Sequence, residues 1–220
     1  MKKFLIATMC LAVALTFTAC SSEHSVTTET KVSFSTDELQ DSLDAGNKAI
    51  DAGNFDDAIK NFDKAIEIDD ECLPAYTGRG IAYASNKDYD SAIKDFDKTI
   101  KLDPKYAEGY SNRGQAYAEK GDAQKAMDDF NKAIEVDPKY ANAYNNRGVL
   151  YLNANDNDKA FADFNKAIEL DPNYASAYNN RGAFYANTGD NEKAIADFKK
   201  ALEIDPNYKS AADNLKKVSG

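Results

Sequence analysis

Four arginines recur along the chain at a fixed interval, and each is followed by an aspartate sixteen residues later. Arginine presents a planar fork of donors that matches the two oxygens of a carboxylate, so the two residue types can form bidentate ion pairs. Upstream, Ala45 and Asn61 stand at the corresponding places, so both residue types are missing together. We therefore predict structural pairs, within one repeated unit or between neighbours; the alternative is that the arginines bind an acidic ligand. The residues are Arg79, Asp95, Arg113, Asp129, Arg147, Asp163, Arg181 and Asp197.

Three asparagines, Asn112, Asn146 and Asn180, recur at the same interval. An asparagine side chain both donates and accepts hydrogen bonds. A ladder of them could therefore bind the backbone of an extended peptide whatever its sequence. The alternative is that asparagine is favoured at this place by contacts within the helix.

No group of residues in the sequence is typical of catalysis. His24 is the only histidine, and we find no nucleophile with a paired base, no glycine-rich phosphate loop and no cysteine or histidine cluster. The numerous carboxylates recur beside lysines, as on solvated helix surfaces. We predict that the protein is not an enzyme and that it uses no cofactor and no metal.

The interval behind these patterns is 34 residues, and it repeats five times without insertion or deletion. A period of this length is the signature of a solenoid, in which each unit stacks on its neighbours. In each unit two sets of small or apolar residues recur with helical spacing, which predicts two helices joined by a short turn. The expected fold is all-α: an α-solenoid of five 34-residue helix-turn-helix units. The units span 39–72, 73–106, 107–140, 141–174 and 175–208, with a capping helix at 209–220.

The recurring spacing of small and large residues in the five units indicates how a unit packs. Position 8 of every unit is glycine and position 24 is phenylalanine, so we expect a helix to approach the glycine too closely for a Cβ. Position 15 is glycine in three units, Lys87 in the second and Asn155 in the fourth. We expect the left-handed conformation that ends a helix at this position, with Lys87 the least suited to it.

One unit contains an aromatic, a glycine, an aromatic, an alanine, an aromatic, an alanine and a proline at positions 4, 8, 11, 20, 24, 27 and 32. These residues are Tyr144, Gly148, Tyr151, Ala160, Phe164, Ala167 and Pro172. This pattern resembles the tetratricopeptide repeat (TPR) family, and the resemblance covers residues 39–208. It implies that the first helices line a concave groove which binds extended protein segments.

By the same resemblance, positions 2, 5, 6, 9, 12 and 13 of each unit face that groove. The predicted groove residues are Asn112, Gln115, Asn145, Asn146, Val149, Leu152, Asn179 and Asn180. The asparagines are similar to the asparagine ladder of TPR-containing glycosyltransferases. Lysine and arginine are missing at the groove positions of units 2 to 5, so we do not expect the carboxylate clamp of chaperone-binding members.

The first twenty residues predict export. Lys2 and Lys3 precede the uncharged apolar run of residues 4–19, which is short for a membrane span and typical of a signal peptide. Phe-Thr-Ala before Cys20 resembles the lipobox of bacterial lipoproteins, which implies cleavage after residue 19 and a lipid on Cys20; the alternative is an ordinary cleaved signal peptide in which Cys20 is incidental. Residues 20–35 are the expected tether, and by resemblance Ser21 favours the outer membrane over the outer face of the plasma membrane.

The formal charge of −10 becomes −12 once Lys2 and Lys3 are removed, because no other charge lies in residues 1–19. So acidic a chain repels phosphate backbones, which argues against nucleic acid as a partner. We predict a scaffold, anchored to the membrane by its N-terminal lipid, that binds envelope proteins or extended peptide segments. The alternatives are a protein that binds a glycan or small ligand in the same groove, and a self-associating protein, with a homodimer formed through open repeat ends or Cys72.

Overall fold

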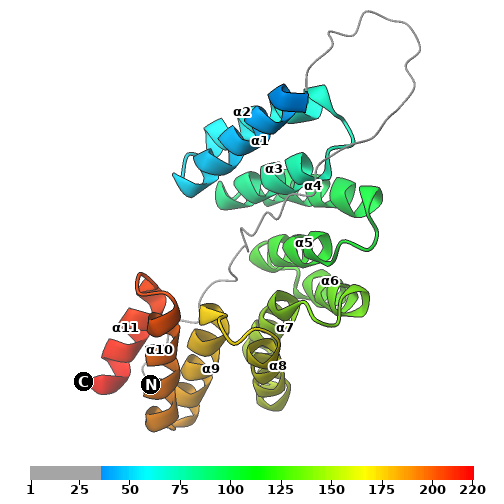
Figure 1. Ribbon diagram of the computed structural model, residues 1–220. Coiled ribbons are helices and arrows are strands. Elements are labelled where there is room, and N and C mark those ends of the chain that lie inside the picture. Colours follow the sequence, from blue (N-terminus) through cyan, green and yellow to red (C-terminus); the bar gives the residue numbers. More distant parts are fainter. Residues whose placement is uncertain (1–35) are drawn as a thin grey trace, which may run out of the picture. The chain divides into compact units, whose positions relative to one another are not determined.

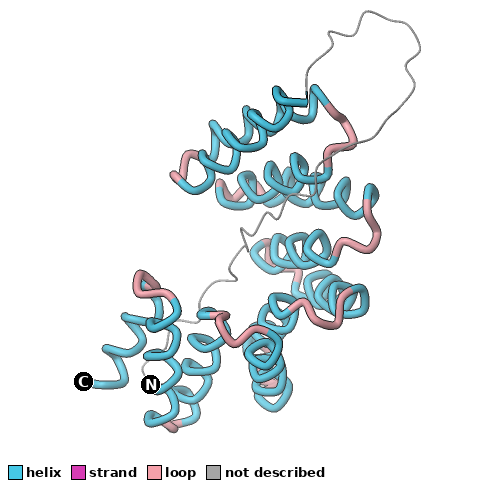
Figure 2. Tube along the Cα trace, viewed as in Figure 1, coloured by secondary structure: helices cyan, strands magenta, loops and turns pink. Residues whose placement is uncertain are grey.

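The computed structural model describes residues 36–220; the predicted signal peptide, Cys20 and the tether lie outside them. Within these residues, all regular structure is helical, as the repeat pattern predicts (Figures 1 and 2). The helices are α1 (Thr36–Asp51), α2 (Phe55–Ile68), α3 (Leu73–Ser85), α4 (Tyr89–Leu102), α5 (Ala107–Glu119), α6 (Ala123–Val136), α7 (Ala141–Asn153), α8 (Asn157–Leu170), α9 (Ala175–Thr188), α10 (Asn191–Ile204) and α11 (Lys209–Ser219).

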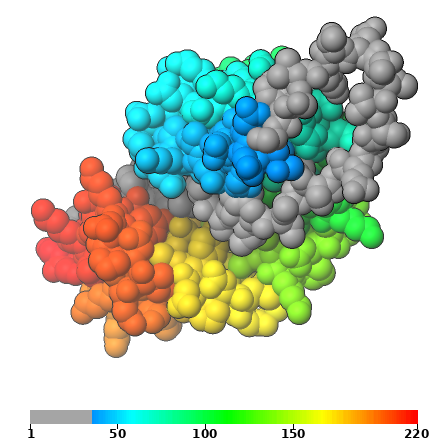
Figure 3. Space-filling model, turned by 45° about the horizontal axis from the view of Figure 1, so that its top comes forward, coloured from blue at the N-terminus to red at the C-terminus, as the bar shows by residue number. Residues whose placement is uncertain are grey.

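These helices belong to two compact units, which part between Lys120 and Gly121. The N-terminal unit holds α1 to α5 and the C-terminal unit holds α6 to α11. In the C-terminal unit, α9, α10 and α11 pack one on the next, and they appear in yellow to red in Figure 3. None of the helices between Thr36 and Ser219 is long and apolar enough to cross a membrane.

Odd-numbered helices lie side by side within each unit. In the N-terminal unit α3 contacts both α1 and α5, and in the C-terminal unit α9 contacts both α7 and α11. The even-numbered helices of one unit make no such contact with each other over the described residues. The odd-numbered helices therefore form a continuous layer in each unit, and we call the side of this layer that faces away from the even-numbered helices the inner face.

Within each compact unit, the core of a helix pair is a phenylalanine packed on a glycine. Phe164 in α8 is fully buried, and a Cβ built on Gly148 in α7 would lie 2.7 Å from its Cε1 atom. The same contact occurs between Gly182 and Phe198. The predicted close approach is confirmed, and the ring that excludes the Cβ belongs to the second helix of the same repeat.

The turns between paired helices contain a residue in the left-handed conformation. Two of these residues are not glycine: Lys87 has a φ angle of 64° and Asn155 one of 60°. The prediction for position 15 is therefore confirmed. After four of these five turns an aspartate caps the start of the next helix; Asp156, for example, accepts a hydrogen bond from the backbone N–H of Lys159.

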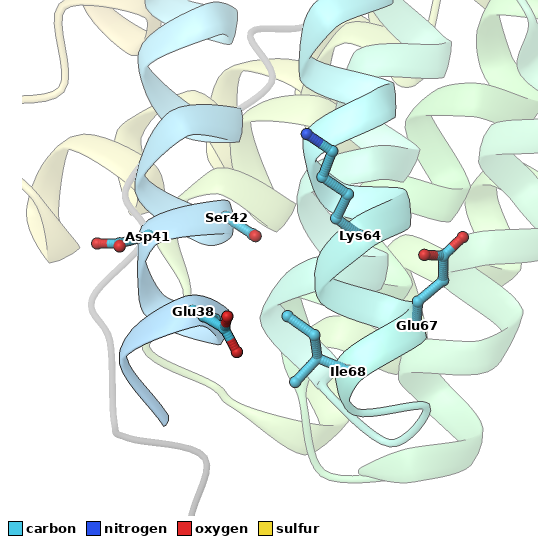
Figure 4. Close-up of a pocket in the computed structure, with 6 residues that line it drawn as sticks. All are labelled: Glu38, Asp41, Ser42, Lys64, Glu67 and Ile68. Atoms are coloured by element: carbon cyan, nitrogen blue, oxygen red, sulfur yellow. The ribbon is translucent and has the colours of Figure 1, made fainter. Parts of the chain in front are cut away.

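The first repeat has a hollow where the others carry a tyrosine ring. Ser42 in α1 stands at the place of Tyr76, Tyr110, Tyr144 and Tyr178. In Figure 4 its side chain points toward α2, where Lys64 and Ile68 line a cavity of about 310 Å³. In the second repeat, Lys98 lies over the Tyr76 ring, 5.3 Å from its centre, at the position that corresponds to Lys64. The cavity thus marks a missing aromatic ring at the start of the solenoid.

Candidate functional site

Three of the four repeated arginines bind aspartates of their own repeat. Arg147 donates from Nε and Nη2 to the two carboxylate oxygens of Asp163, at 2.8 Å each. Arg181 makes the same pair of bonds to Asp197 at 2.8 Å, and Arg79 bonds Asp95 at 2.8 and 2.7 Å. Of the remaining predicted pair, Arg113 belongs to the N-terminal compact unit and Asp129 to the C-terminal one.

A third donor of each arginine reaches the preceding repeat. Arg147 Nη1 lies 2.8 Å from Asn131 Oδ1, and Arg181 Nη1 lies 2.7 Å from Asn165 Oδ1. In the N-terminal unit the acceptors are charged: Asp63 for Arg79 at 2.5 Å, and Asp97 for Arg113 at 2.6 Å. The pairs therefore join successive repeats as well as the two helices of one repeat.

Tyrosine rings and carboxylates hold each guanidinium in place. The Arg79 guanidinium lies between the rings of Tyr76 and Tyr83, 5.5 and 5.9 Å from their centres. Hydrogen bonds from Arg79, first to Asp95 and then to Asp63, raise its pKa above the usual value despite partial burial. The donors of Arg79 are therefore used in hydrogen bonds within the protein.

The predicted groove asparagines bond to one another. Asn180 Nδ2 donates to Asn145 Oδ1 at 2.9 Å, across the boundary between two repeats. Asn214 in α11 repeats this bond to Asn179 at 3.0 Å. Within α7, Asn146 donates to Asn142 at 2.7 Å. These amides are buried, so the ladder is also a network that ties adjacent first helices together.

A row of tyrosines at the last position of the repeats was not predicted as part of the groove. Tyr174 accepts a hydrogen bond at 3.1 Å from Asn142, and Tyr208 donates at 3.2 Å to Ser176. Both partners stand at position 2, which is one of the predicted groove positions. The period of these tyrosines is visible in the sequence, but it does not show that their hydroxyls reach position 2 of the same repeat. The row comprises Tyr106, Tyr140, Tyr174 and Tyr208, with Cys72 in the first repeat.

In α5, position 2 of the repeat is an acidic residue, Glu108, where α7 has Asn142 and α9 has Ser176. Glu108 accepts a hydrogen bond at 2.7 Å from the Tyr106 hydroxyl through Oε2. Burial raises the pKa of the Glu108 carboxyl, against the opposing effects of Tyr106 and Asn112. Its Oε1 atom is buried without a hydrogen-bond partner, and so is Nδ2 of Asn112 one turn further along.

The other predicted groove residues share these helix faces. Gln115 follows Glu108 and Asn112 on α5 at intervals that place all three on one side. Val149 is buried and Leu152 is partly exposed, and both follow Asn145 on one side of α7. None of the helices α3, α5, α7 and α9 contains a lysine, and the one basic residue of each is the paired arginine.

Sequence comparisons agree with this geometry. Models described as tetratricopeptide repeat match residues 46–72, 141–174 and 175–208, and a model described as TPR repeat matches 80–121 and 114–155. A crystal structure of MamA protein is 30% identical, over 79% of this chain and 96% of that one, with a TM-score of 0.56. The chain belongs to the tetratricopeptide repeat family.

Other solved TPR proteins have the same fold. TTC0263, a thermophilic TPR protein of Thermus thermophilus, superposes with a TM-score of 0.75 at 22% identity, over 82% of this chain and 98% of that one. YrrB, described as a TPR protein with an unusual peptide-binding site, has a TM-score of 0.52 at 25% identity, over 80% of this chain and 90% of that one. Among curated proteins, no sequence matches the chain.

Proposed function

We propose that this TPR protein is a lipid-anchored scaffold of the bacterial cell envelope which binds extended protein segments on its inner face. The observation that carries the proposal is the separation of side-chain types between the two helix layers. Together the inner helices α3, α5, α7 and α9 present amides, tyrosines and small apolar groups without lysine, whereas each of the second helices α4, α6, α8 and α10 carries at least two lysines. Neutral donors and acceptors in a row suit the backbone of an extended chain.

Binding of protein segments by the TPR family and the peptide-binding site described for YrrB support this function. The envelope location is supported by the signal-like residues 1–19 and by the small residue before Cys20. A diacyl or triacyl anchor would hold the protein stably, because each buried methylene contributes about 0.8 kcal/mol and one chain alone binds only marginally.

The anchor is tested with the full chain and a Cys20→Ser variant in a Gram-negative host. We expect wild-type protein in the membrane fraction, labelled by an alkyne-tagged palmitate, and the variant unlabelled. Separation of the two membranes by density then tests the outer-membrane prediction. An unlabelled wild-type protein that is processed and released in soluble form would refute lipid anchoring.

Binding is tested by crosslinking and capture in the same host. Leu152→Glu places a charge on the face of α7 that holds Asn145, while Ala162→Glu makes the same charge change on an exposed position of the paired helix α8. We expect a defined set of envelope proteins to be captured by wild type and by Ala162→Glu, and to be lost with Leu152→Glu. Equal capture by all three would place the binding surface elsewhere.

A further inference from the structure

The inner face differs from one helix junction to the next. Between α7 and α9, and again between α9 and α11, an asparagine amide at position 6 donates to an asparagine at position 5 of the preceding repeat. Between α3 and α5 the position-5 residue is Thr77, whose hydroxyl donates to the carbonyl of Leu73 at 3.1 Å. The bond that closes the other two junctions is therefore not made here.

At this junction the donor at position 6 is Asn112, and it lacks the acceptor that its counterparts Asn180 and Asn214 have. Its side chain is 3% exposed, and its Nδ2 group has no hydrogen-bond partner. A buried donor without a partner costs roughly 1–3 kcal/mol, so native structures seldom keep one without a reason. A ligand that supplies an acceptor would recover that free energy.

Glu108 lies next to this unpaired donor. The Asn112 side chain acts on the Glu108 carboxylate as a donor that opposes the rise of its pKa, yet the geometry of the two groups gives neither Oε1 of Glu108 nor Nδ2 of Asn112 a hydrogen bond. Tyr106 holds Oε2 at 2.7 Å and so fixes the orientation of the group. No basic side chain of the described residues contributes to the electrostatics of this carboxylate, which leaves a half-buried negative charge without a cation.

The junction thus offers an unpaired acceptor with negative charge beside an unpaired neutral donor. A lysine or arginine residue of an extended chain complements both, because it combines a cationic side chain with a backbone carbonyl. We propose that the α3–α5 junction selects a basic residue of the bound segment: its side chain pairs with Glu108 and its carbonyl accepts from Asn112. This inference rests on the proposed binding of extended segments to the inner face, and it adds a residue preference and a place.

The probes are oriented peptide libraries of twelve residues. All positions are random neutral residues except a fixed central one, which is arginine, lysine, glutamine or glutamate. Each library is bound to the full chain purified from membranes and to two variants. Glu108→Gln removes the charge at the junction; Glu71→Gln removes an exposed charge of the same compact unit and serves as the control.

We expect wild type and Glu71→Gln to retain the arginine and lysine libraries at least about tenfold better than the glutamine library. Glu108→Gln is expected to bind all neutral and basic libraries alike. A preference for basic peptides that persists in Glu108→Gln would overturn the assignment. Binding that never depends on the central residue would overturn this inference and leave the proposed function standing, whereas no binding of any library would overturn both.

Asn112→Ala tests the second half of the proposal. Since its amide is assigned to the backbone, the variant should weaken the arginine and glutamine libraries by the same factor. Circular dichroism of each variant, compared with wild type, shows that it is folded. Unchanged affinity in folded Asn112→Ala would remove the backbone contact from the proposal.

Discussion

Asn180 in α9 donates a 2.9 Å hydrogen bond from its side-chain amide to the side-chain oxygen of Asn145 in α7. The two residues are 35 positions apart and belong to successive repeats. Their bond shows that an asparagine which recurs once per repeat serves the stacking of the repeats. Any contribution of the same amides to peptide binding must be measured against this structural role.

Asn180→Ala should lower the free energy of unfolding by about 1–2 kcal/mol, because the buried Asn145 oxygen loses its donor from the next repeat. Asn187→Ala is the control: it makes the same change on an exposed position of α9, where alanine gains only helix propensity. Urea denaturation followed by circular dichroism measures both. A stable Asn180→Ala protein that has lost its partners would favour a binding role for the ladder.

Arg147→Ala should cost about 3 kcal/mol, because it leaves the buried carboxylate of Asp163 without its bidentate partner. The Arg147 side chain is 19% exposed. Lys159→Ala removes a cation whose side chain is 61% exposed, and it should cost much less than Arg147→Ala because solvent screens the ion pair. Thermal and urea unfolding of both variants test the contrast; equal, small effects would show that the repeated arginines are dispensable for stability and favour the acidic-ligand alternative.

Gly148→Ala should destabilise the protein by about 1–3 kcal/mol although alanine is the better helix former. The added Cβ would lie 2.7 Å from the Phe164 ring, which is itself fully buried. In a Phe164→Leu background the same glycine substitution should cost less, and a double-mutant cycle measures this difference. Purely additive effects would mean that the glycine is required for another reason.

Lys87→Gly should stabilise the second repeat by about 0.5–1 kcal/mol, because Lys87 is held at a φ of 64°. Asn155→Gly at the equivalent turn should change stability less, since asparagine tolerates this conformation better than lysine. The midpoints of thermal unfolding provide the comparison. A larger gain from Asn155→Gly than from Lys87→Gly would contradict the backbone argument.

Glu108→Gln should raise stability near neutral pH and thereby expose a conflict between stability and binding. Burial raises the carboxyl pKa in the folded state, so the native chain holds this proton more tightly than the unfolded chain does. Stability of the wild type therefore falls as the pH rises from the unfolded pKa, about 4.3, through the raised folded value. The variant lacks this loss, so the difference in unfolding free energy should grow across that window and then level off. A constant difference would show that ionisation of Glu108 does not oppose folding.

Much of the fold could be predicted because the same pattern occurs in five successive repeats of the chain. Glycine at position 8 with phenylalanine at position 24 defined the packing of a helix pair, and the left-handed turn followed from glycine and asparagine at position 15. The pairing of Arg147 with Asp163 was expected from their joint recurrence. The further hydrogen bond from Arg147 Nη1 to Asn131 of the preceding repeat was not expected, because the acceptor changes between aspartate and asparagine along the chain.

The chemistry of the inner face was harder to predict. Asn146 and Asn180 have the residue type for peptide binding, but sequence alone does not show that a neighbouring helix brings an acceptor within reach. Tyr174 was not predicted because the sequence does not show that its hydroxyl reaches Asn142 of the same repeat. Glu108 became informative only once the structure showed that no cation of the described residues lies beside it, since exposed glutamates are common on such helices.

The third donor of each arginine, Nη1, makes the links between repeats unequal along the chain. Toward the N-terminus the links are ionic, from Arg79 to Asp63 and from Arg113 to Asp97, whereas Arg147 and Arg181 reach neutral asparagines. Dissolved ions screen the former more than the latter. Because a solenoid behaves as a row of units coupled to their nearest neighbours, its weakest coupling decides where opening begins. Higher ionic strength therefore weakens the links within the N-terminal compact unit first, and it favours opening of the repeats in that unit.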